Sequence, residues 1–117
     1  MLIYAVALFA VAALFGVYML TRVLGGALPP WPAAILHGLL AATGLLLLLY
    51  VAFLTGAPAP QPVVIAAVLF VIAALGGFLA LSFHLRKQPI PKALGLIHGL
   101  VAVCGFLVLC ASVFNFI

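Results

Sequence analysis

The chain has 117 residues, of which 71% are hydrophobic and 3% are charged, with four Lys or Arg residues and no Asp or Glu. Because a soluble domain carries roughly a quarter charged residues, this composition predicts an integral membrane protein with lipid as its solvent. A chain without carboxylates can build no Ser-His-Asp triad, no carboxylate acid/base pair and no Ca²⁺ or Mg²⁺ cage. We therefore expect no enzymatic activity.

Four apolar runs follow one another along the chain, at residues 2–20, 33–54, 63–83 and 91–116. Each approaches or exceeds the roughly 20 residues that a helix needs to cross about 30 Å of hydrocarbon. The segments between them, residues 21–32, 55–62 and 84–90, contain prolines and are too short for a soluble domain. The sequence thus predicts an all-α integral membrane protein, with four transmembrane helices in one domain covering residues 1–117.

The basic residues indicate an orientation. All of them lie in the first and third connecting segments or beside them, and the middle segment has none. By the positive-inside rule these two segments are cytoplasmic, so we expect both ends of the chain to face the periplasm of a bacterial-type inner membrane. Trp31 fits an anchor at the cytoplasmic headgroup level. The side chains that could contact anionic lipid or haem propionates on this side are Arg22, His84, Arg86, Lys87 and Lys92.

The chain also resembles itself. Sliding it by 61 residues aligns positions 1–53 with 62–114, and 18 of the 53 pairs are identical, where chance gives roughly 6. His37-Gly38-Leu39 recurs as His98-Gly99-Leu100. This pattern predicts a duplicated two-helix hairpin, with repeats at residues 1–56 and 62–117, related by a pseudo-two-fold axis along the membrane normal.

Small residues share one face of the second and fourth predicted helices with the histidines. Such faces let membrane helices approach closely, as in GxxxG motifs, and equally leave room for a cofactor. The residues assigned to helix packing or a cofactor pocket are Ala34, Gly38, Ala41 and Gly44, with Gly95, Gly99, Ala102 and Gly105.

The repeat places His37 and His98 at the same depth, one to two helical turns inside the cytoplasmic end of each span. Two imidazoles at one depth on facing helices can ligate the iron of a b-type haem. The pair resembles the histidines of membrane cytochrome b subunits, which implies electron transfer. One hypothesis is therefore a small accessory subunit of a bioenergetic redox complex, with haem b between His37 and His98.

Three alternatives compete with the haem hypothesis. In the first, each histidine is a polar tie within a cofactor-free structural or assembly subunit. In the second, each is the single ligand of a chlorophyll-type pigment, one in each repeat. A transporter is disfavoured: the four-span layout is similar to the small multidrug-resistance transporters, but their essential intramembrane Glu is missing here. We expect the partners to be lipid and either other membrane subunits or a second copy, and no nucleic acid.

Overall fold

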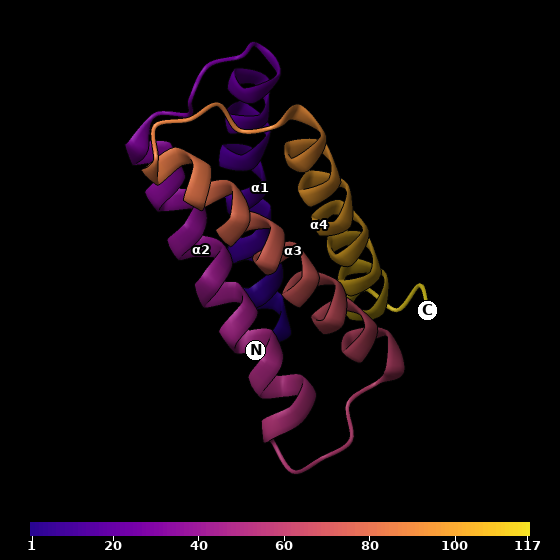
Figure 1. The fold of residues 1–117 in the computed structure, drawn as a ribbon. Helices are drawn as coiled ribbons and strands as arrows, with labels where there is room; N and C mark the ends of the chain where they lie inside the picture. Colours follow the sequence, from indigo (N-terminus) through magenta and orange to yellow (C-terminus); the bar gives the residue numbers. More distant parts are fainter.

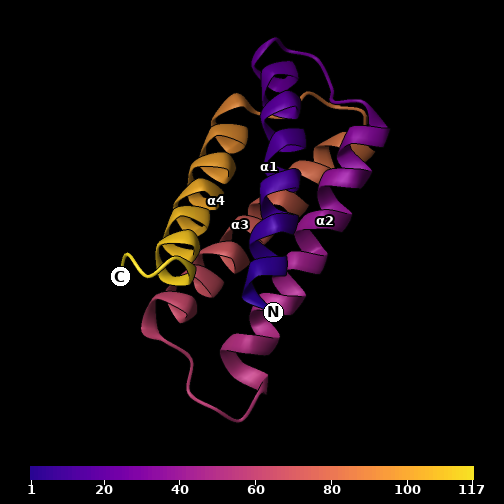
Figure 2. The same cartoon turned by 180° about the vertical axis from the view of Figure 1, so that it is seen from behind.

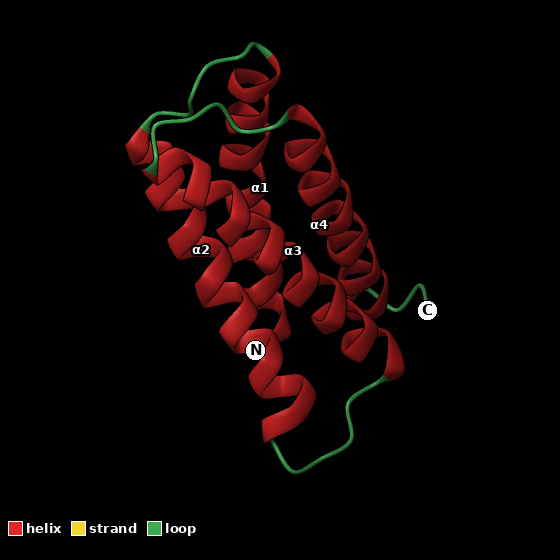
Figure 3. Cartoon of the chain, in the orientation of Figure 1, coloured by secondary structure: helices red, strands yellow, loops and turns green.

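Four long helices joined by short connections form the computed structural model, which describes all 117 residues (Figures 1 and 3). The helices are α1 (Leu2–Leu24), α2 (Trp31–Leu49), α3 (Gln61–Leu85) and α4 (Lys92–Val113), and a π-helical turn, η1 (Tyr50–Leu54), continues α2. Counting α2 and η1 together, all four are long and apolar enough to cross a membrane. The predicted all-α fold is confirmed, and its four helices are those expected of a multi-pass membrane protein.

The dimensions of the bundle match those of a bilayer. Its principal extents are 44 × 24 × 19 Å, and a bilayer with its headgroup regions is about 40–45 Å thick. Only 19 of the 117 residues are buried, so most of the large apolar side chains lie on the outer surface. Such a surface suits contact with lipid tails.

Prolines fix where three of the helices begin. Pro30, Pro60 and Pro91 are the residues immediately before α2, α3 and α4, and Pro32 and Pro62 lie in the first turn of α2 and α3. A proline is tolerated there because the first backbone N–H groups of a helix have no partner within it. Both α2 and α3 therefore start two residues before the predicted apolar runs.

A shared cap ends α1, α3 and α4. After α1, the N–H of Ala27 donates to the carbonyl of Arg22 and that of Gly26 to Val23, both at 3.0 Å, which is the Schellman pattern. The residue that takes the required positive φ is Gly26 (80°) after α1, Lys87 (55°) after α3 and Asn115 (62°) after α4. Because the cap rather than the loss of hydrophobicity ends the helix, α1 and α3 extend beyond their predicted ends.

The helices occupy the corners of a square. Helix α1 packs on α2 and α4, and α3 packs on the same two neighbours, so α1 lies diagonally opposite α3 and α2 opposite α4 (Figures 1 and 2). The α1–α2 and α3–α4 loops lie at one end of the bundle and the α2–α3 loop at the other. We call the end with the α1–α2 and α3–α4 loops the basic end, because all four Lys and Arg residues lie at or beside these loops.

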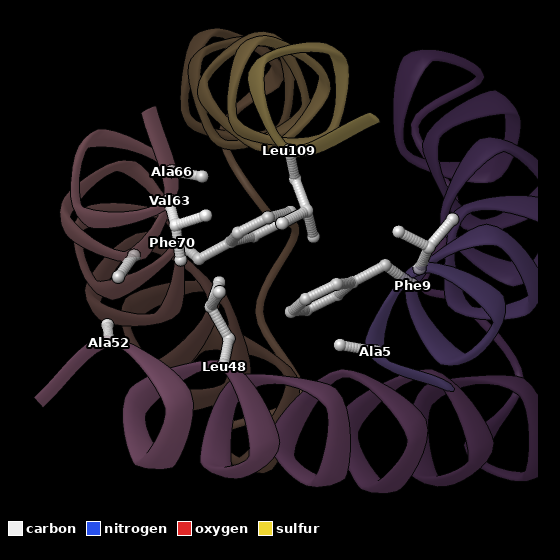
Figure 4. Packing of buried hydrophobic residues seen from close by; sticks show 10 residues of the cluster. Ala5, Phe9, Leu48, Ala52, Val63, Ala66, Phe70 and Leu109 are labelled. Atoms are coloured by element: carbon white, nitrogen blue, oxygen red, sulfur yellow. The ribbon is translucent and has the colours of Figure 1, made fainter. Parts of the chain in front are cut away.

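The apolar core lies toward the other end. At its centre the rings of Phe9 and Phe70 stack across the α1–α3 diagonal, with centroids 3.9 Å apart and planes 2° from parallel (Figure 4). Leu48 from α2 and Leu109 from α4 are fully buried beside them. The cluster is completed by Ala5, Val6, Ala52, Val63, Ala66 and Ala67.

Candidate functional site

His37 and His98 meet near the centre of the bundle, one on α2 and the other on the diagonally opposite α4. Their ring centroids are 6.2 Å apart and the ring planes are inclined by 77°, so the rings meet edge to face. Both side chains are half-buried. The structure thus brings these two predicted site residues together.

Each histidine is held by a carbonyl of the other helix in its hairpin. Nδ1 of His37 lies 2.8 Å from the carbonyl oxygen of Ala12, and Nδ1 of His98 lies 2.7 Å from that of Ala73. A carbonyl oxygen can only accept, so in both rings Nδ1 carries the proton and donates. In the neutral imidazole, Nε2 then carries a lone pair, and neither Nε2 has a hydrogen-bond partner in the chain.

Two glycines allow these approaches. A Cβ added at Gly16 would lie 3.0 Å from Cε1 of His37, and one added at Gly77 would lie 3.2 Å from Cε1 of His98. Each glycine lies four residues after the carbonyl that accepts the histidine N–H, on the same face of its helix. The recurring Ala-x-x-x-Gly of α1 and α3 thus forms the binding surface for the imidazole ring, which we call the imidazole seat: the Ala carbonyl accepts the Nδ1 proton and the Gly leaves space for Cε1.

The small residues of α2 and α4 divide into groups with different neighbours. Gly44 and Gly105 are buried against the phenyl rings of the core, because an added Cβ would lie 3.2 Å from Phe9 and 3.3 Å from Phe70. At these positions the small side chain makes room for a phenyl ring.

The remaining small residues lie nearer the basic end. Gly95 and Gly99 of α4 face Leu20 of α1, at 3.3 and 3.9 Å from an added Cβ. Gly38 of α2 has nothing within 4 Å. Ala34 lies beside Gly38 in an open groove, and Ala41 and Ala102 are half-buried.

No hydrogen bond joins the basic side chains to the histidine pair. Arg22, Lys87 and Lys92 are exposed and their side chains form no hydrogen bond within the chain. The guanidinium group of Arg86 folds back on the end of α3, where Nε donates to the carbonyl of Ser82 at 3.1 Å and the group lies 4.7 Å from the Phe83 ring centroid.

The third histidine belongs to a different contact, which the sequence did not reveal. The His84 ring stacks on Trp31, with centroids 3.8 Å apart and planes 3° from parallel, and the residue is only 5% exposed. The sequence placed both residues at headgroup level but gave no sign of their contact, because they lie 53 positions apart on different helices.

Sequence reasoning assigned no role at the site to Ala12, Ala73 or the Phe9–Phe70 pair, because these roles come from a backbone carbonyl and from helix packing. A signal existed, since Phe9, Ala12 and Gly16 all recur 61 residues later. No group of three or more His, Cys, Asp or Glu residues is placed to hold a metal ion. The chain matches no protein-family model, and no curated protein or solved structure proved similar to it.

Proposed function

We propose that this protein is a small structural subunit of a membrane protein complex, and that hydrogen bonds from His37 and His98 hold its helices together. The observation that carries the proposal is the pair of Nδ1–H···O=C bonds to Ala12 and Ala73, each made over a glycine that fits the ring. A bond of this kind between membrane helices contributes about 1 kcal/mol. The two ties fix the pairing of α1 with α2 and of α3 with α4.

The space around the histidine pair favours the structural proposal over the haem proposal. The donor atoms suit an iron, because a metal-bound histidine commonly donates its other N–H to a backbone carbonyl. The space does not suit a macrocycle. Gly44 and Gly105, which the sequence offered as room for one, instead accommodate the stacked rings of Phe9 and Phe70, and each glycine lies seven residues, about two helical turns, from the histidine of its own helix.

Asparagine substitutions separate the two functions. The side-chain nitrogen of Asn is as many bonds from Cα as Nδ1 of His, so His37→Asn and His98→Asn can keep the bond to the carbonyl but cannot ligate iron. We expect both variants to retain most of the thermal stability in detergent, and His37→Leu and His98→Leu to lose about 1 kcal/mol each. His84→Asn is the control for loss of a histidine outside the pair.

A reduced-minus-oxidised absorption spectrum of the same preparations decides the alternative. Haem b between His37 and His98, in a bioenergetic accessory subunit, is the second candidate because both Nε2 atoms lack a partner. It predicts a b-type band that is present in the wild type and absent from all four variants at the pair. Such a band would refute the structural proposal. A bound chlorophyll-type pigment would show as absorption that each single variant halves.

We further infer that the chain is a duplicated hairpin with a pseudo-two-fold axis along the bundle. The contacts at the centre support this, because each has a counterpart 61 residues away: Phe9 stacks on Phe70, and the bond from His37 to Ala12 corresponds to the bond from His98 to Ala73. An expressed single repeat, residues 1–56, would then assemble as a dimer. A monomer of that fragment in detergent would count against the inference.

The proposed orientation puts the basic end in the cytoplasm and both chain ends in the periplasm. It is supported by the position of all Lys and Arg residues at one end. With the native Cys104 and Cys110 replaced by Ala, a cysteine at Ala57 should react with an impermeant maleimide in intact cells. One at Gln88 should not, and the reverse labelling would invert the topology.

Neighbouring subunits are the proposed partners. The outer surface is apolar along all four helices, and a subunit of this kind acts by filling space and holding neighbours. Gentle solubilisation followed by native electrophoresis should show the chain in a complex larger than a monomer. A monomer that persists at every detergent concentration would contradict this proposal.

A further inference from the structure

A short apolar groove lies between α2 and α3 near the basic end. It has a volume of about 250 Å³ and is lined by Trp31, Ala34, Ile35, Gly38, Leu39 and Leu81. Its floor at Gly38 is open, since an added Cβ there would meet nothing within 4 Å. The matching seam between α1 and α4 is closed, because Leu20 packs on Gly95. The groove is therefore a feature of one seam and not of the fold in general.

The shape of the groove limits its occupant. The groove runs from Trp31 to Leu39, which is about 12 Å along α2 at 1.5 Å per residue. Its volume divided by this length gives a mean cross-section on the order of 20 Å². A single hydrocarbon chain, about 4–5 Å wide at van der Waals contact, fits this cross-section.

The charge at the mouth selects the headgroup. Trp31 opens the groove and stacks on His84, so the mouth adjoins the end of α3 that carries Arg86 and Lys87. Lys87 has no hydrogen-bond partner, and Arg86 uses only part of its five N–H groups within the chain. Because the chain has no Asp or Glu, these charges are not neutralised internally and attract an anionic group.

We propose that this groove binds one anionic phospholipid, with an acyl chain against Gly38 and Leu81 and the phosphate at Arg86 and Lys87. The apolar lining accounts for the chain and the adjoining cations for the headgroup. The proposal is independent of the role of the histidine pair, which lies between α2 and α4 and not in this seam.

The only tryptophan of the chain, Trp31, lines the groove and reports on its occupant. The protein is reconstituted in vesicles of equal parts phosphatidylglycerol and phosphatidylcholine, with brominated acyl chains on one lipid or the other. Bromine quenches tryptophan fluorescence on contact. We expect brominated phosphatidylglycerol to quench Trp31 at an apparent affinity at least about five-fold higher, the effect of one cation near an anionic headgroup. Equal quenching by the two lipids would overturn the proposal.

Two charge variants test whether the site is local. The double variant Arg86→Gln with Lys87→Gln should lose the preference for phosphatidylglycerol while both lipids still quench. The control, Arg22→Gln with Lys92→Gln, removes the same charge at the same end but from α1 and α4, and should keep the preference. An equal loss in both would mean attraction to the whole basic surface and would refute a site at this groove.

A third variant fills the groove. Gly38→Leu should be accommodated, because its Cβ meets open space, and we expect the preference to vanish. Ala13→Leu, on an exposed part of α1, is the control and should leave the preference intact. An unchanged preference in Gly38→Leu would overturn the proposal. So would a loss of quenching by both lipids as the protein-to-lipid ratio rises, since this would mean that a second copy covers the groove.

Discussion

Replacing Gly16 with Ala tests whether the imidazole seat is as tight as the structure shows. The new methyl group would lie 3.0 Å from Cε1 and 3.3 Å from Nδ1 of His37, closer than van der Waals contact allows. The ring must therefore shift, and we expect the shift to disturb the bond from Nδ1 to the carbonyl of Ala12, which is 2.8 Å long. The bond contributes about 1 kcal/mol and the overpacking costs about 1–3 kcal/mol. The higher helix propensity of Ala stabilises the protein by up to about 1 kcal/mol, which offsets part of this loss.

The sum predicts a net destabilisation of about 1–3 kcal/mol for Gly16→Ala. Gly38→Ala is the matched control, because the added Cβ meets nothing within 4 Å, and it should stabilise the protein by up to about 1 kcal/mol. Unfolding in mixed micelles of mild detergent and SDS, followed by circular dichroism, measures both. Gly77→Ala at 3.2 Å from Cε1 of His98 should resemble Gly16→Ala.

A double-mutant cycle identifies the cause. In a His37→Ala background the ring is absent, so Gly16→Ala should no longer destabilise and should take the sign of Gly38→Ala. The coupling energy is expected at about 2–4 kcal/mol, which is the lost bond plus the overpacking, because the gain in helix propensity is the same in both backgrounds. If Gly16→Ala costs the same in both backgrounds, or nothing in the wild type, the ring is not seated on Gly16 and the reasoning about the histidine tie fails.

Further predictions concern the caps and the aromatic core. Lys87 has a left-handed φ of 55°, so the Lys87→Gly variant should be more stable than the Lys87→Ala variant by about 1 kcal/mol. Gly26 has a φ of 80°, so Gly26→Ala should destabilise the protein by about 1 kcal/mol in the same micelle assay. Equal stability of the Gly and Ala variants at 87 would argue against a strained cap. Phe9→Leu should destabilise the protein by about 0.5–1.5 kcal/mol through loss of the ring stack with Phe70. The double variant Phe9→Leu with Phe70→Leu should lose less stability than the sum of the two single variants, because the stack can be lost only once. Strict additivity in this pair would contradict the observed stack.

The sequence predicted the four helices well but not their ends. An apolar run marks the part of a helix that lies in hydrocarbon, whereas the backbone stays helical until a cap satisfies its last carbonyls. Thr21 and Arg22 therefore lie inside α1, although the apolar run stops at Leu20. The Schellman cap of α1 centres on Gly26, which has a recognisable sequence signal. The equivalent cap of α3 uses Lys87, which has none.

At the site, the sequence predicted which two histidines meet but not what holds them. Depth follows from counting residues along a helix, and it placed His37 and His98 together. The acceptor of each Nδ1 proton depends on rotamers and on how the helices cross, which no residue pattern specifies. The similar motifs around Gly38 and Gly99 illustrate the limit, because one glycine faces open space and the other faces Leu20.

The two diagonal contacts have a mechanical consequence. A square bundle deforms most easily by shear into a rhombus, which shortens one diagonal and lengthens the other. Phe9 and Phe70 already touch along the α1–α3 diagonal, and His37 and His98 touch along the α2–α4 diagonal. Shear in either direction compresses one pair of rings, and close-packed side chains resist compression. The two contacts therefore oppose shear of the bundle in opposite directions, each at the level where its rings meet.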